Sequence, residues 1–308
     1  MTTNAERIRW IKKRAIRRVD AYEGLGYGAV RLLLGVVTTI RSTYNSRKLA
    51  TVHWSRGNGM WRHNFPEGRL LDRQRWHSAE HYATRGAYDI YDLLWRHYKP
   101  ATGDVVIDVG AGNGGETLFL AGMVGKEGRV VAIEPADVPF ERLVAMCALN
   151  RWSHVEPHKV ALSATSGTVS ISESESWVSS NIYEGGTSEV RSTTLDDLCD
   201  QLGITSVNWL KMNIEGAEKE AIQGMERMAP NVKNMTISCH DFLGTDWGRS
   251  KMVVTKWLKD HGFEVRTHGP GLEAEKDYIY AWRGDRNQVD RDIGPPPLYD
   301  FGESEAEC

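Results

Sequence analysis

The sequence predicts an α/β fold with a doubly wound, mostly parallel sheet. From residue 104 onward, short apolar runs alternate with segments of helical periodicity, as in parallel strands joined by crossover helices. A glycine-rich turn after the first run is the second indication, because such turns lie at the carboxyl ends of strands in open sheets. The predicted strands are residues 104–109, 129–134, 155–160, 207–213, 232–239, 263–268 and 277–283. The predicted helices are residues 114–123, 137–150, 195–203, 217–228 and 249–261.

The chain of 308 residues accommodates one sizeable domain with extensions. We expect residues 101–284 to form the α/β domain, with short extra strands and a substrate-facing loop within residues 163–193. Residues 1–100 are predicted to be a basic, helical N-terminal extension and cover. The acidic, Pro-containing segment 285–308 is expected to be a flexible tail.

Within the extension, basic and apolar residues alternate at helical spacing in residues 7–22, and residues 29–40 are predicted to continue as a more apolar helix. Residues 51–80 show no clear periodicity and are expected to be a loop-rich cover. Residues 25–40 are too short and too rich in glycine to predict a transmembrane helix.

The charge of the chain is unevenly distributed. Residues 1–50 hold eleven Lys and Arg against three acids, while the whole chain has a net charge of -3. A basic arm on an acidic body indicates an anionic partner for the arm, either a membrane surface or a nucleic acid. Four scattered cysteines form no CxxC pair, so no zinc site or disulfide framework is predicted and a reducing cytoplasm is expected.

The strongest local motif is the run VVIDVGAGNGG at residues 105–115, an apolar strand that enters a glycine-rich turn. Glycine lets the backbone turn tightly and approach a ligand closely. The second predicted strand ends at Glu134, whose carboxylate can accept hydrogen bonds from the two hydroxyls of a ribose. These features predict a nucleoside-containing cofactor, but they fit a nicotinamide dinucleotide and S-adenosylmethionine equally well.

Residues 209–218, WLKMNIEGAE, resemble the KIDVEGAE-type motif of the FkbM family of methyltransferases. The resemblance extends over about residues 104–240 and includes the glycine-rich turn, Glu134, and the segments 160–163 and 193–198. It implies a class I methyltransferase (Rossmann-like) fold that uses S-adenosylmethionine. It also implies O-methylation, often of a hydroxyl on a sugar, a glycolipid or a natural product.

The resemblance assigns cofactor-binding roles to matching positions. The methionine and ribose parts of the cofactor would be lined by Asp108, Gly110, Gly112, Asn113 and Gly114. The ribose would be held by Glu134, and the adenine would be bordered by Ala161 and Leu162. Structural alternatives remain open, since Asp108 can cap the following turn and Leu162 can be part of the core.

The candidate catalytic residues follow two predicted strands. Asn213 and Glu215 come after residues 207–213, and His240 and Asp241 come after residues 232–239. His240 is the expected base, because an ordinary histidine with a pKa of about 6.5 is largely neutral at pH 7. Asp241 would orient it, and Asn213 or Glu215 would hold the acceptor hydroxyl. Two alternatives are a His-Asp pair that only caps the next helix, and a divalent cation held by Glu215, Asp241 and His240, although no spacing is diagnostic of a metal.

Two other functions stay open at this stage. An NAD(P)-dependent oxidoreductase would share the glycine-rich turn and the ribose carboxylate. A non-catalytic methyltransferase-fold binding protein is also open, because the family pattern usually has Asp where this chain has Asn213, and an amide has neither the charge nor the basicity of a carboxylate.

The expected partner is a small-molecule or glycan acceptor, and nothing in the motifs indicates nucleic acid as substrate. The basic helix at residues 7–22 is expected to lie on an anionic membrane surface, which would place a cytoplasmic enzyme at the membrane periphery. Alternatively, it packs on its own domain or on a second subunit of a homo-oligomer.

Overall fold

The fold was established from a computed structural model. The residues that it describes are 28–46, 51–65, 68–72, 94–172, 181–182, 188–241, 244, 249–267 and 277–284. The predicted helix at residues 7–22 and the predicted tail at residues 285–308 lie outside this part of the chain.

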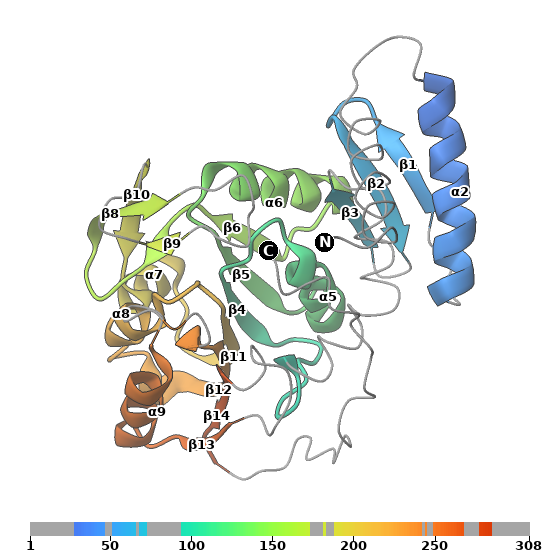
Figure 1. Ribbon diagram of the computed structural model, residues 1–308. Helices are drawn as coiled ribbons and strands as arrows, with labels where there is room; N and C mark the ends of the chain where they lie inside the picture. The colour runs from blue at the N-terminus through green and yellow to red at the C-terminus, as the bar shows by residue number, and fades with distance from the viewer. Residues whose placement is uncertain are drawn as a thin grey trace, which may run out of the picture.

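The centre of the molecule is a seven-stranded sheet with the order β13-β14-β12-β11-β4-β5-β6 (Figure 1). Its strands are β4 (Val105–Val109), β5 (Arg129–Ile133), β6 (Val155–His158), β11 (Val207–Met212), β12 (Val232–Ser238), β13 (Glu264–Thr267) and β14 (Tyr278–Trp282). Strand β14 is antiparallel to β12 and β13, while the pairs from β12 through β6 are parallel. The doubly wound, mostly parallel sheet and all seven predicted strands are confirmed.

Helices cover both faces of this sheet. They are α5 (Gly115–Val124), α6 (Asp137–Asn150), α7 (Leu195–Leu202), α8 (Glu218–Gln223) and α9 (Lys251–Asp260). Val106 packs into a core with Leu118 of α5 and Leu143 of α6, whereas the next residue, Ile107, belongs to the core on the opposite face, which contains helices α7, α8 and α9. Burial on both faces explains why the strands are nearly continuous apolar runs. Helix α8 is shorter than predicted.

A second sheet has the order β7-β10-β8-β9. Its strands are β7 (Ala161–Leu162), β8 (Gly167–Ser172), β9 (Asn181–Ile182) and β10 (Ser188–Thr193). Strands β8, β9 and β10 are the short extra strands expected between residues 163 and 193, while β7 comes just before that range. Strand β7 pairs with β10 in parallel, and β10 pairs with β8 antiparallel.

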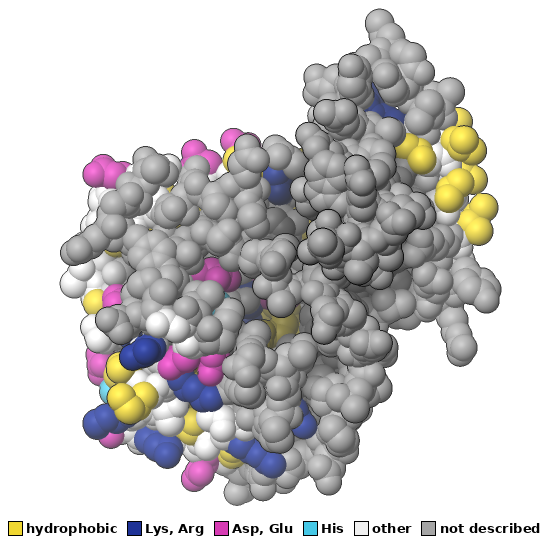
Figure 2. Space-filling view, viewed as in Figure 1, with side chains coloured by type: hydrophobic (Ala, Val, Ile, Leu, Met, Phe, Trp, Pro, Cys, Tyr) yellow, Lys and Arg dark blue, Asp and Glu magenta, His cyan; other side chains and the backbone are white. Residues whose placement is uncertain are grey.

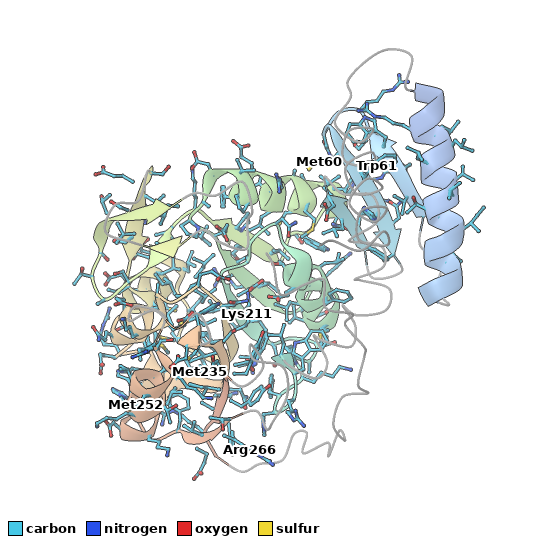
Figure 3. The ribbon with its side chains drawn as sticks, in the orientation of Figure 1. Met60, Trp61, Lys211, Met235, Met252 and Arg266 are labelled. Atoms are coloured by element: carbon cyan, nitrogen blue, oxygen red, sulfur yellow. The ribbon has the colours of Figure 1, made fainter. Side chains whose placement is uncertain are left out.

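The N-terminal region differs from the prediction. Helix α2 (Gly28–Ser46) includes the predicted helix, but β1 (Thr51–Ser55), β2 (Met60–Phe65) and β3 (Gly68–Asp72) form an antiparallel sheet. The expectation of a loop-rich cover is therefore wrong for these strands. Figure 3 labels Trp61, a side chain of β2 that is fully buried and packs with Val52 and Leu34 beneath α2.

Strand β3 joins this small sheet to the main domain. The Arg69 backbone N–H donates to Asn150 Oδ1 at 2.8 Å, and Asn150 Nδ2 donates to the Arg69 carbonyl at 2.8 Å. Leu70 is buried in the core that contains Leu118 of α5. Helix α2 thus lies outside β1, β2 and β3, away from the central sheet (Figure 1).

Candidate active site

The turn between β4 and α5 brings the carboxyl ends of β4 and β11 into contact. Gly110 has a φ of +77°. A Cβ at this position would lie 1.9 Å from the backbone oxygen of Asn213. The backbone N–H of Asn213 in turn donates to the Val109 carbonyl at 3.1 Å. Glycine at 110 is therefore required by the packing of two strand ends.

The backbone donors of this turn are largely used within the chain. Both Gly110 and Ala111 donate their N–H groups to the Ile133 carbonyl at 3.0 Å, and Gly114 donates to the Ala111 carbonyl at 2.9 Å. The Gly112 N–H donates to Glu134 Oε2 at 2.9 Å. Four N–H groups that could face a ligand are thus already bound to protein oxygens.

Glu134 follows β5 and is held from two sides. Its Oε2 accepts from Gly112, and its Oε1 accepts from the Ala136 N–H at 2.9 Å. Burial raises the pKa of Glu134, while these two hydrogen bonds act in the opposite direction. A carboxylate has about four acceptor positions, so two remain for the hydroxyls of a ribose. The geometry fits the nucleoside of the expected cofactor.

A buried lysine lies beneath the glycine-rich turn (Figure 3). Lys211 Nζ is 3.0 Å from Asp108 Oδ1 and 2.7 Å from Glu116 Oε2, and it donates to the Gly110 carbonyl at 2.8 Å. Asp108 Oδ2 accepts from the Thr117 hydroxyl at 2.7 Å. Burial by itself lowers the pKa of Lys211, but the charges of Asp108 and Glu116 outweigh it and raise the pKa.

Two site assignments change as a result. Asp108 was expected to line the cofactor, but its side chain has no exposed surface and both oxygens contact protein groups. Asp108 therefore stabilises the turn, which was the structural alternative. Lys211 was given no role from the sequence, although the signal was present: it is a single charge within the buried strand VNWLKM, where burial requires an acidic partner.

The second charged cluster surrounds His240, which follows β12. His240 Nδ1 is 2.8 Å from Glu218 Oε1, and Nε2 is 3.3 Å from Glu215 Oε2. The Glu218 side chain is completely buried at the start of α8. Its carboxylate also accepts from the Gly216 N–H at 3.1 Å and from the Ser250 hydroxyl at 2.9 Å. Glu218 is a site residue that the sequence reasoning missed.

The contacts of His240 bear on the role predicted for it. Burial alone lowers the pKa of His240, but the hydrogen bonds and charges of Glu215 and Glu218 outweigh it and raise the pKa to about 10. A raised pKa favours the protonated imidazole, which cannot accept a proton. These contacts therefore argue against His240 as a neutral base, and its catalytic role stays a prediction.

Asp241 also differs from its predicted role. Its Oδ2 accepts from the backbone N–H groups of Ser250 at 3.0 Å and Lys251 at 2.9 Å, at the start of α9. Asp241 thus caps the next helix, which was the structural alternative, and the carboxylates on His240 are those of Glu215 and Glu218. Within the described residues, no group of three or more His, Cys, Asp and Glu side chains is arranged to hold a metal ion.

Asn213 and Glu215 remain as groups that can meet a ligand. Asn213 Oδ1 is buried and has no hydrogen-bond partner in the described part of the protein. Glu215 has a φ of +56°, a strained conformation that costs a non-glycine residue about 1–3 kcal/mol. Its side chain is 23% exposed, whereas those of His240 and Glu218 are buried. Glu215 is therefore the accessible carboxylate of this cluster.

The remaining predicted cofactor residues lie close to this edge of the sheet. Gly112 and Asn113 are half-buried in the glycine-rich turn. Ala161 packs with Ala136, the residue whose N–H is bound by Glu134. Leu162 is buried in the core on the α7 face. Their contact with an adenine ring stays a prediction.

The central sheet order, the helices on both faces and the carboxylate after β5 define a class I methyltransferase fold. Comparison with known proteins agrees. Residues 108–265, just over half of the chain, match the family model described as the methyltransferase FkbM domain. The protein belongs to the FkbM methyltransferase family.

Individual relatives are distant. The chain is 25% identical over 203 residues to the hexuronic acid methyltransferase AglP of Haloferax volcanii. The matched segment covers 65% of this chain and 78% of the relative. A solved FkbM methyltransferase of Methylobacillus flagellatus is 16% identical with a TM-score of 0.45, covering 83% of this chain and 60% of that one. The chain therefore spans less than two thirds of that protein. Aeropyrum pernix fibrillarin, solved with natively bound S-adenosyl-L-methionine, is 12% identical with a TM-score of 0.42 and covers 75% and 93% of the two chains.

Proposed function

We propose that this protein is an S-adenosylmethionine-dependent O-methyltransferase that acts on a hydroxyl of a sugar or glycolipid. The observation that carries the proposal is the state of the glycine-rich turn. Four of its backbone donors are bound within the chain, and Glu134 is left with acceptor positions for the hydroxyls of a nucleoside.

The same observation argues against a nicotinamide dinucleotide. A pyrophosphate binds at a glycine-rich turn through free backbone N–H groups at a helix N-terminus. Here the N–H groups of Gly110, Ala111, Gly112 and Gly114 already bind protein oxygens, and one of these oxygens carries negative charge. An anionic pyrophosphate would find few donors at this turn.

The charge around the site favours a cationic ligand. The Lys211 cluster and the protonated His240 cluster each contain one cation and two carboxylates. Each cluster therefore has one more negative charge than positive charge. A buried excess of negative charge attracts a sulfonium ion more strongly than it would in water, because the local dielectric constant is low.

When bound, S-adenosylmethionine would supply a methyl group on a positively charged sulfur. The methyl carbon–sulfur bond would break as the acceptor oxygen bonds to that carbon, and neutral S-adenosylhomocysteine would be the leaving group. Alignment of the acceptor supplies much of the catalysis. We assign the acceptor hydroxyl to Glu215, whose accessible carboxylate can accept its hydrogen bond and take its proton as the new C–O bond forms. Asn213 Oδ1 offers a second unfilled acceptor beside the turn. His240 and Glu218 are positioning residues that hold Glu215.

The acceptor class rests on the family and on the relative named as a hexuronic acid methyltransferase. The decisive assay incubates the protein with a methyl-labelled cofactor and a panel of glycans and glycolipids. Label on a sugar hydroxyl supports the proposal. Binding of S-adenosylhomocysteine without any transfer favours a non-catalytic binding protein, and calorimetric binding of NAD in its place favours an oxidoreductase.

Three variants test the site. Glu134→Ala should weaken S-adenosylhomocysteine binding by about 1.5–3 kcal/mol, the range for hydrogen bonds to a charged group. Glu215→Gln should lower turnover about 100-fold with cofactor affinity preserved. Glu220→Gln is its matched control, because this neighbouring carboxylate is half-exposed and contacts Lys219. Equal turnover in Glu215→Gln and the control would refute the role of Glu215.

A positioning role for His240 is tested by the pH profile. His240→Gln keeps a hydrogen-bond donor but not the titrating charge. It should lower turnover less than Glu215→Gln does and shift the pH profile of the remaining activity. A uniform loss at every pH, without any shift, would show that His240 only supports the fold.

A further inference from the structure

Helix α2 has an exposed aliphatic stripe on its outer face. Figure 2 shows hydrophobic side chains gathered along this helix, at the upper right of the molecule. The five large aliphatic residues of the stripe are between 45% and 70% exposed. They are Leu32, Leu33, Val36, Val37 and Ile40. Contiguous apolar surface of this kind marks a contact with another apolar phase or partner.

The opposite face of α2 already has its packing partners. Leu34 packs with Val52 and Trp61, and the Val52 N–H donates to the Thr39 hydroxyl at 2.8 Å. A Cβ at Gly35 would lie 2.7 Å from the Val52 carbonyl oxygen, so the helix backbone rests directly on β1. The exposed stripe is therefore additional to what the helix needs for packing on its own domain.

The surrounding sequence is strongly basic. Between Glu23 and Glu67 the chain contains no Asp or Glu, and it contains six Lys and Arg. These residues are Arg31, Arg41, Arg47, Lys48, Arg56 and Arg62. A further seven precede Glu23, against two acids. An aliphatic stripe within a basic stretch of sequence that contains no acids has the composition of a helix that lies in a lipid interface.

We propose that the aliphatic stripe of α2 inserts into the surface of a bilayer that contains anionic lipids. The side chains from Leu32 to Ile40 enter the acyl boundary, and the net positive charge of residues 24–66 attracts the anionic headgroups. In the described part of the chain, no helix is long and apolar enough to cross a membrane. In this proposal, helix α2 lies along the bilayer surface with its exposed stripe toward the lipid.

Two protein segments could cover the stripe instead of lipid: a second copy of this chain, or residues 1–22 of the same chain. Charge argues against both. A second copy of this chain would bring two acid-free stretches with six cations each into contact, and like charges repel. Residues 1–22 would add seven more cations against two acids. An anionic lipid surface is the occupant that the local charge complements.

The test measures sedimentation of the full-length protein with sucrose-loaded vesicles at low ionic strength. Vesicles contain phosphatidylcholine alone or phosphatidylcholine with phosphatidylglycerol. The wild-type protein should bind the anionic vesicles at least about tenfold more strongly, and 0.5 M salt should weaken this binding, because screening shortens the range of the attraction. Equal binding to both vesicle types would overturn the proposal.

Leu33→Ser/Ile40→Ser removes two exposed side chains of the stripe without adding charge. It should reduce binding to the anionic vesicles about tenfold or more. Met252→Ser is the matched control, because Met252 on α9 is 81% exposed and lies outside the stripe. Thermal unfolding should confirm that both variants fold. Unchanged vesicle binding in the double variant would overturn the proposal. It would also be overturned if the wild-type protein does not bind vesicles but forms a dimer that the double substitution dissociates.

Discussion

Two buried cations lie at the same edge of the central sheet, and each contacts two carboxylates. Lys211 contacts Asp108, which is fully buried, and Glu116, which is 32% exposed. His240 contacts Glu218, which is fully buried, and Glu215, which is 23% exposed. The arrangements are alike, but a lysine stays charged throughout the physiological pH range, whereas a histidine can lose its proton.

The Lys211 cluster therefore keeps the charge of its cation as pH changes, whereas the His240 cluster can lose it. The Lys211 cluster secures the turn through the Gly110 carbonyl. The His240 cluster holds Glu215, the accessible carboxylate, and its charge depends on the two acids around it. Changes to each cluster should therefore affect stability by different amounts and with different pH dependence.

The largest effect is expected from Lys211→Met. It leaves Asp108 buried without its cation, and breaking a buried pair in this way costs about 3–5 kcal/mol. The melting temperature should fall by roughly 10 °C in calorimetry. Lys256→Met is the control, because the pair of Lys256 with Asp260 is exposed and should contribute less than about 0.5 kcal/mol. Similar melting temperatures for the two variants would contradict the importance of the buried cluster.

The pH dependence of stability should come next. His240 has a pKa of about 10 in the folded protein, against about 6.5 in an unfolded chain. Above pH 6.5 the folded state keeps a proton that the unfolded state releases, so the free energy of unfolding falls as pH rises. The fall should reach about 1.4 kcal/mol per pH unit.

Urea unfolding at pH 6.5, 7.5 and 8.5 measures this effect. The slope of the wild-type protein should exceed that of His240→Gln, while Lys211→Met should keep the wild-type slope. Equal slopes for wild type and His240→Gln would show that His240 is not protonated in the folded state.

Glu218→Gln should have a smaller effect at constant pH. It replaces a charged acceptor of four donor groups by a neutral amide, at a cost of about 1.5–3 kcal/mol. It should also reduce the pH dependence just described, because His240 loses one of its acids. A variant as stable as wild type at pH 7 would place the stabilisation on Glu215 instead.

Glu116→Gln should have the smallest effect, about 1 kcal/mol or less, because this partner of Lys211 is partly exposed. Asp108→Asn, the change at the buried partner, should cost clearly more. The two melting curves compare them directly. Equal costs would mean that burial does not decide the contribution of each acid.

The central sheet was predictable because burial on both faces makes its strands continuous apolar runs. Glu134 was singled out because a carboxylate directly after such a run can accept hydrogen bonds from the hydroxyls of a ribose, and that role stays a prediction. The sheet of β1, β2 and β3 was missed because buried and polar residues are mixed in it: in β2, His63 is as buried as Trp61. Asn58-Gly59, between β1 and β2, was a usable turn signal.

The charged clusters could not be derived from the chain order. His240 and Asp241 are neighbours in sequence, and this adjacency favoured an Asp-His pair. In the structure, the backbone N–H groups of α9 bind Asp241, while Glu218 reaches His240 from the start of a different helix. The pKa of His240 follows from those contacts and not from its sequence neighbour.

The contact between Gly110 and Asn213 affects how variants of the glycine-rich turn should be interpreted. Alanine at 110 would push its Cβ against the Asn213 backbone and separate the ends of β4 and β11 before any ligand arrives. Loss of cofactor binding in Gly110→Ala would then reveal damaged sheet geometry and would not identify a ligand contact. Amide hydrogen exchange near Val109 and Asn213 in the ligand-free variant would reveal that damage, whereas Glu134→Ala should leave the exchange there unchanged.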